Sequence, residues 1–338
     1  MLGFAGWALL SVQGAAVAVR ADVARAAWLI PALLALHLVQ LLLSAIAWRG
    51  LLAPRPPQGT STAARPALPS LALFWRLRIV REGIDSMLPV AQVGGEIVGA
   101  RLLGRLGVPA PRAGASIVVD VTLELLTQVL FLGAGLLALA TLPHGGSGAG
   151  SWGPTAWLLP AVGGMAALLV LAQRLGALRG LERLTGMVAR HVPGFADLRG
   201  LQAEAEAIYR RGPALWRAAG LHGLAWLLGT AETWAVLHAL GQSASPQQAL
   251  VVESLGMAAR SAGFALPGAI GVQEGGFVLA AAAAGLSGTA GMATGIGVGL
   301  ALSLLKRLRE IAAGVLGLAL WRWRWPGTPP AGDAAGPP

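Results

Sequence analysis

Two copies of one short pattern decide how this chain folds. Residues 88–96 read LPVAQVGGE and residues 266–274 read LPGAIGVQE, so each copy runs Leu-Pro, six residues, Glu. Proline removes a helical hydrogen bond and glycine frees the backbone, so each stretch should interrupt a helix. Broken backbone at membrane depth is tolerated only where protein buries it or where it lines a wet cavity. We therefore expect two helix breaks facing a polar interior, with Glu96 and Glu274 where the helices restart.

The composition indicates an all-α integral membrane protein. The 338 residues are 55% hydrophobic and 12% charged, whereas a soluble domain carries about 25% charged residues. The mean hydropathy is +0.67. Six apolar stretches are near or above the roughly 20 residues that span a bilayer: 1–19, 27–48, 113–142, 157–172, 214–240 and 289–321. A soluble helical core would need polar outer faces, which these stretches lack.

The absence of cysteine excludes disulfides, cysteine-ligated zinc and thiol catalysis. We expect no metal and no cofactor. The net charge of +10 does not indicate a nucleic-acid partner, because basic residues in a membrane protein mark cytoplasmic loops and contact anionic headgroups.

The distribution of arginine predicts the topology. Segments 143–154 and 241–248 contain no basic residue and are expected outside, whereas arginine-rich segments are expected in the cytoplasm, together with both termini. Threading the chain on this basis gives two units of opposite orientation, each with two spanning helices, a re-entrant hairpin and a third spanning helix. Such an inverted-topology repeat, with about six spanning helices and two broken hairpins, is common in secondary transporters.

The units have these expected bounds. The first repeat covers 1–142, with a cytoplasmic loop at 49–81 and a re-entrant hairpin at 82–108. The second covers 143–325, with a cytoplasmic loop at 173–213 and a re-entrant hairpin at 249–287. A disordered tail follows at 326–338.

Ionisable residues within the apolar stretches are the candidate functional groups. Asp120 and Glu124 lie one helical turn apart and share a face. Such a residue in a spanning helix costs roughly 2.5–3.5 kcal/mol, so it usually faces a cavity or a partner. The alternative for this pair is a structural ion pair with Arg101 or Arg105. The alternative for Glu96 and Glu274 is that each only caps its own helix.

Further candidates lie near the second break and in the last apolar stretch. Lys306 and Glu310 in the sequence KRLRE are spaced to pair with each other, or with carboxylates of the first unit. The full set of candidates for substrate binding or coupling is Glu96, Glu274, Gln92, Gln273, Asp120, Glu124, Arg101, Arg260, Lys306 and Arg307. The expected helix-breaking residues are Pro89, Gly94, Gly95, Pro267, Gly268, Gly271 and Gly275. No catalytic residue is assigned.

These motifs resemble the flippase-like family that includes the membrane domain of lysylphosphatidylglycerol synthases. The resemblance rests on a Pro–Gly–Glu element at 89–96, the acidic stretch VVDVTLELLTQ at 118–128, and a Pro-Gly…Gly-x-x-Glu-Gly element at 267–275. Relatives often carry arginine where this chain has Gln92 and Gln273, which favours a weakly polar lipid over a phosphate-rich one. The sequences QVGGE and DVTLE are most similar to the subgroup found with hopanoid biosynthesis.

The resemblance implies a multi-pass protein of the bacterial inner membrane that transports lipids of the hopanoid or polyprenyl type. Lipid-synthesis enzymes are the protein partners it implies. Two alternatives remain open. One is an intramembrane enzyme that uses paired glutamates as acid and base on a lipid headgroup. The other is a scaffold for a lipid-synthesis complex.

Overall fold

A computed structural model of the chain describes residues 17, 19–52, 68–88, 94–142, 158–174, 179–180, 182–183, 198–263, 266–286 and 292–322. These residues form helices and short connections and contain no strand, which confirms the prediction of an all-helical protein. Pro89, Gln92 and the tail 326–338 lie outside the described residues.

Five of the six expected apolar stretches coincide with helices, and nearly all of the sixth, 1–19, lies outside the described residues. Ten helices and two short 3₁₀ turns have names and bounds in the described part of the chain: η1 (Ala27–Leu29), α2 (Ile30–Leu52), α3 (Leu71–Met87), α4 (Gly94–Arg105), α5 (Ala110–Thr141), α6 (Leu158–Arg174), α8 (Leu201–Tyr209), α9 (Gly212–Ala239), α10 (Pro246–Ala262), η3 (Pro267–Ala269), α11 (Val272–Ala283) and α12 (Met292–Arg322).

The segment expected as a cytoplasmic loop at 49–81 differs from the prediction. Helix α2 continues to Leu52, and α3 begins at Leu71 after Ser70, whose Oγ accepts a hydrogen bond of 3.3 Å from Leu73 N. Arg78 and Arg81 lie three residues apart, which places them near each other on α3, and both are buried. The density of arginine suggested a solvated loop, but burial beside carboxylates allows these two residues to lie in a packed helix.

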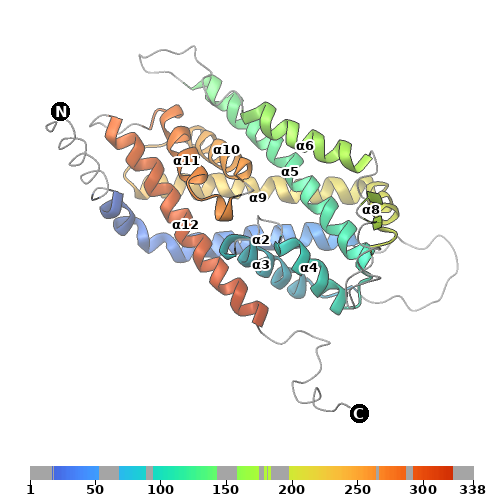
Figure 1. Cartoon of the computed structure of the whole chain (residues 1–338). Helices are drawn as coiled ribbons and strands as arrows, with labels where there is room; N and C mark the ends of the chain where they lie inside the picture. Colours follow the sequence, from blue (N-terminus) through green and yellow to red (C-terminus); the bar gives the residue numbers. More distant parts are fainter. Residues whose placement is uncertain are drawn as a thin grey trace, which may run out of the picture.

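Figure 1 shows how the two halves of the chain interleave. Helix α2 lies beside α9, α3 lies beside α12, and α10 packs between α5 and α11. Three hydrophobic cores result in the described part of the chain. One joins α5 to α9, α10, α11 and α12, and a second joins α2, α3, α4 and α5 through Trp48, Phe74, Leu103 and Ile117. The third joins α2 and α5 to α8 and α9.

Small residues allow α3 and α12 to approach closely. A Cβ added at Gly83 would lie 2.8 Å from the carbonyl oxygen of Gly314 and 2.9 Å from Cα of Gly317. Glycine at such a crossing brings the two backbones into direct van der Waals contact, as is common between membrane helices.

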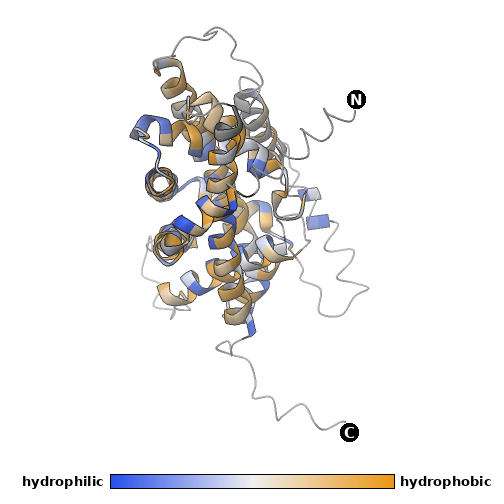
Figure 2. Ribbon diagram, turned by 90° about the vertical axis from the view of Figure 1, so that its left-hand side faces the viewer, coloured by the Kyte–Doolittle hydropathy of each residue, from blue (hydrophilic) through white to orange (hydrophobic). Residues whose placement is uncertain are grey.

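The bundle carries apolar side chains on its outside and charged ones inside, as expected for a membrane protein. Trp216, Leu130 and Leu137 are 81%, 74% and 71% exposed, whereas Asp120 and Glu232 are fully buried. Figure 2 shows apolar residues along much of the helical ribbon, with hydrophilic residues at a few places within it. Two described segments, Val19–Leu52 and Ala110–Thr141, are long and apolar enough to cross a bilayer by length and composition.

Candidate functional site

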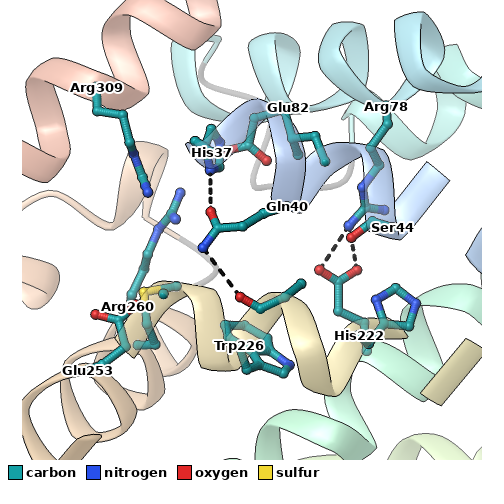
Figure 3. A pocket seen from close by; sticks show the side chains of 15 residues that line it. His37, Gln40, Ser44, Arg78, Glu82, His222, Trp226, Glu253, Arg260 and Arg309 are labelled. Atoms are coloured by element: carbon teal, nitrogen blue, oxygen red, sulfur yellow. Dashed lines mark hydrogen bonds and ion pairs between the residues drawn. The ribbon is translucent and has the colours of Figure 1, made fainter. Parts of the chain in front are cut away.

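A cavity of about 110 Å³ lies where α2, α3, α5, α9, α10 and α12 meet. A water molecule needs about 10–15 Å³ of such space, so the cavity has room for several waters or a small polar group. Its polar lining, most of it labelled in Figure 3, consists of His37, Gln40, Ser44, Arg78, Glu82, Glu124, His222, Glu253, Arg260 and Arg309. Three arginines and three glutamates therefore face one small space inside the bundle.

Asp120 organises the first of two charged clusters. Its side chain is fully buried in α5, where Oδ2 lies 3.3 Å from Arg78 Nη1 and Oδ1 lies 3.1 Å from His222 Nε2. Arg78 also donates hydrogen bonds of 2.6 and 2.8 Å from Nη2 to the Glu124 carboxylate. These contacts connect α3, α5 and α9 on one side of the cavity.

The second cluster joins α12 to α9 and α10. Arg309 Nη1 donates to both carboxylate oxygens of Glu232, at 2.7 and 2.9 Å. Lys306 Nζ lies 2.9 Å from Glu253 Oε2, which also accepts a hydrogen bond of 2.5 Å from Thr233. Buried pairs of this kind are costly to break, because removing one partner leaves an uncompensated charge.

Glu274 lies in the first turn of α11 and has two kinds of partner. Its Oε2 accepts a hydrogen bond of 2.6 Å from Gly271 N, at a backbone φ of +83°. Its Oε1 accepts one of 2.7 Å from Arg307 Nη2, and Arg307 Nη1 donates to the Gly268 carbonyl at 2.6 Å. Glu274 thus caps its own helix, and it also fastens α11 and the preceding turn to α12.

Glu96 occupies the corresponding position in the first turn of α4, which begins at Gly94. Its carboxylate forms an ion pair with the buried Arg81, whose guanidinium lies 4.7 Å from the ring centroid of Trp48. The amide of Gly95 donates a hydrogen bond of 2.8 Å to Asp85 Oδ1. Gly95 has no room for a side chain, because an added Cβ would overlap Asp85 and the backbone of Arg81.

The remaining predicted site residues lie at different distances from the cavity. Glu124 and Arg260 line it, whereas Asp120 and Lys306 are buried behind its wall. Gln273 is fully buried and donates a hydrogen bond of 3.3 Å to Glu310. Among the predicted helix breakers, Pro267 and Gly268 lie in η3, and Gly275 lies within α11.

Two predicted pairings are wrong. Asp120 and Glu124 pair with Arg78 rather than with Arg101 or Arg105, which are exposed on α4. Lys306 pairs with Glu253 and Glu232 of the second half, whereas Glu310 pairs with Arg260, Arg307 and Arg309. Lys306 therefore pairs with carboxylates of other helices, whereas Glu310 has arginine partners both on its own helix and on α10.

Sequence reasoning missed several residues of the site. Arg78 lay in the stretch expected to be a loop, and Arg309 was not distinguished from the other basic residues around it. His37 and Gln40 were overlooked, although their spacing of three places them on one face of an apolar helix. Within the described residues, no group of three or more His, Cys, Asp or Glu side chains is placed to hold a metal ion.

Comparison with known proteins gives a family match for this chain. Residues 1–305 match the family model described as lysylphosphatidylglycerol synthase TM region, which confirms the resemblance seen in the motifs. No curated protein and no solved structure matches the chain. The matched region contains every lining residue of the cavity except Arg309. The chain therefore belongs to the lysylphosphatidylglycerol synthase transmembrane-region family, a family of membrane proteins with a lipid-related function.

Proposed function

We propose that the protein moves a membrane lipid between leaflets in the manner of a flippase, with the lipid headgroup passing through the central cavity. The observation that carries this proposal is a cavity lined by three arginines and three glutamates inside a bundle with an apolar surface. Ionisable side chains within a membrane are costly and usually mark a path for a polar substrate. Membership of a lipid-related membrane family supports the same conclusion.

The pairing of charges supports a weakly polar headgroup. Positions 92 and 273 are glutamine where relatives often carry arginine. The cavity is still lined by Arg78, Arg260 and Arg309, which come from other helices. Each of these arginines nevertheless has a carboxylate partner, namely Glu124, Glu310 and Glu232. Little uncompensated positive charge is left for a phosphate-rich substrate. A hydroxyl-bearing isoprenoid lipid of the hopanoid or polyprenyl type fits such a lining.

An inverted repeat is the architecture that we propose for this movement. Helices α2 to α5 contain 23, 17, 12 and 32 residues, and α9 to α12 contain 28, 17, 12 and 31. The contacts follow the same pairing, since α3 packs on α12 as α10 packs on α5, while α2 packs on α9. Under this arrangement α3–α4 and α10–α11 are re-entrant hairpins that enter from opposite sides. Rocking one half against the other would expose the cavity to each leaflet in turn.

The proposed membrane is the bacterial inner membrane, with both termini in the cytoplasm. The orientation is supported by Arg49 in the last turn of α2, by Arg55 and Arg65 between α2 and α3, by the arginine-rich segment at 173–213, and by the absence of basic residues at 143–154 and 241–248.

The test is leaflet-to-leaflet movement in proteoliposomes that contain the purified protein and a fluorescent reporter lipid. Separate preparations carry a hopanoid polyol, a polyprenyl lipid or phosphatidylglycerol. Wild-type protein should accelerate the movement of an isoprenoid reporter, and Glu124→Gln should abolish that acceleration. Glu204→Gln on α8, away from the cavity, is the matched control and should behave as wild type.

Absence of acceleration for all three reporters, with protein that remains folded and inserted, would refute the proposal. Conversion of a reporter into a new lipid species would instead favour the intramembrane enzyme.

A further inference from the structure

We infer that His37 of α2 and Glu82 of α3 form a proton-binding site in the wall of the cavity, with one proton held between His37 Nε2 and Glu82 Oε1. Both side chains line the cavity, and they lie beside each other in Figure 3. The proton-binding site does not depend on the proposed function. Only its consequence, the coupling of lipid movement to protons, rests on that proposal. The site itself follows from the hydrogen-bond geometry.

The tautomer of His37 is determined by its neighbour Gln40. The Gln40 side-chain nitrogen Nε2 donates a hydrogen bond of 3.3 Å to the carbonyl oxygen of Ala225 on α9. The opposite amide orientation would place two oxygens against each other. Gln40 Oε1 therefore faces His37 Nδ1, at 2.9 Å, and accepts a hydrogen bond from it. Since Nδ1 carries the hydrogen, Nε2 of a neutral His37 presents a lone pair.

That lone pair faces a carboxylate. His37 Nε2 lies 3.9 Å from Glu82 Oε1, and within the described residues it has no hydrogen-bond partner. The His37 side chain is 10% exposed and that of Glu82 is 22% exposed, so water screens the pair only partly. Without a shared proton, two acceptors oppose each other in a partly dry space, which is unfavourable. One proton would turn them into a charge-assisted hydrogen bond, closing the gap toward about 2.7–2.9 Å.

Charges of both signs surround the pair. Five carboxylates on α3, α4 and α5 share this side of the bundle with two buried arginines: Glu82, Asp85, Glu96, Asp120 and Glu124, with Arg78 and Arg81. Further charges act on the His37 ring from α12 and α9, namely Arg309, Glu310 and Glu232. Arg309 is already paired with both of these glutamates. Arg260 on α10 is paired with Glu310.

The position of the pair gives the proton a mechanical consequence. Gln40 ties His37 to the backbone of α9, so α2 and α9 are joined at this point. A proton between His37 and Glu82 would add α3 to this unit. Loss of the proton would remove this polar link between α2 and α3, and α3 also packs against α12. Proton binding would therefore favour one arrangement of the two halves over the other.

The test follows protonation directly in the full-length protein, reconstituted in lipid bilayers with ¹⁵N-labelled histidine. Solid-state NMR across the pH range in which the protein stays folded reports the histidine rings, and infrared spectroscopy reports protonated carboxyl groups. The His37 signal is identified by its loss in His37→Gln. We expect the His37 signal and one carboxylic-acid band to change together with pH. In Glu82→Gln that band should be lost and the His37 titration should shift, whereas Glu204→Gln should leave both unchanged.

A His37 signal that does not respond to pH, together with no carboxylic-acid band that depends on Glu82, would overturn the proton site. A second measurement tests coupling in proteoliposomes with a pH gradient. The gradient should change the rate of lipid movement in wild type and in Glu204→Gln, and Glu82→Gln should lose this response. If wild type moves no lipid, the flippase proposal fails, while the titration still decides the proton site. If lipid moves but the pair does not titrate, only the proton site fails.

Discussion

Replacing Glu232 by leucine should destabilise the protein strongly. Glu232 is fully buried in α9, where Arg309 Nη1 contacts both of its oxygens and Lys306 Nζ lies 3.6 Å away. Lys306 keeps Glu253 at 2.9 Å, but among the described residues Arg309 would retain only its longer ion-pair contact of 3.5 Å with Glu310. Removing one partner of a buried ion pair costs about 3–5 kcal/mol, and we expect Glu232→Leu to fall in that range.

The double variant Glu232→Leu/Arg309→Met should recover most of this loss. Replacing a whole buried pair by apolar residues of similar volume is often neutral, because the desolvation cost of both charges disappears with their attraction. The two single substitutions should therefore be strongly non-additive. The surface variant Glu206→Leu is the control. Glu206 lies 3.8 Å from Arg210 and the two side chains are 44% and 76% exposed, so its loss should cost less than about 1 kcal/mol.

The measurement is equilibrium unfolding in mixed detergent micelles, followed by tryptophan fluorescence, for wild type, the two single variants, the double variant and the control. A Glu232→Leu protein as stable as Glu206→Leu would refute the structural assignment of this pair. Additive effects of the two single substitutions would refute it as well, because they would show that Glu232 and Arg309 do not stabilise each other.

Three further predictions concern packing, the cavity and the topology. Gly317→Ala should cost about 1–3 kcal/mol, because its Cβ would overlap the backbone of α3, whereas Gly104→Ala, with open space around it, should be neutral or slightly stabilising in thermal unfolding. Arg260→Gln should reduce lipid movement in proteoliposomes several-fold, and Arg101→Gln, on the exposed face of α4, should leave it unchanged. A reporter inserted at Gly148 should be accessible from outside in intact cells, and a cytoplasmic signal there would contradict the proposed inverted repeat.

Many helix positions could be predicted from the sequence because they depend on local properties. The apolar stretch at 113–142 became α5, and that at 214–240 became α9. Glycine marks the restart of both short helices, so Glu96 and Glu274 each lie in a first helical turn. The prediction was wrong at 71–81. The number of arginines was taken to indicate a loop, whereas these residues form the first part of α3.

The composition of the cavity could not be predicted in the same way. Asp120 and Glu124 were recognised as candidates because carboxylates are rare in apolar helices. Their partner Arg78 could not be chosen from among the arginines, since sequence alone does not give the rotation of one helix against another. His222 contacts Asp120 from 102 residues away.

The sequence by itself determined the class of the protein, its helices, its two helix breaks and the presence of buried charge, because hydrophobicity and backbone propensity act over one or two helical turns. Only the tertiary structure decided which charges pair and which of them face the cavity. Arg78 meets Asp120 across 42 residues, and Arg309 meets Glu232 across 77. Such pairs form only after helices distant in the chain have packed together, when the loss of water makes each unpaired charge costly.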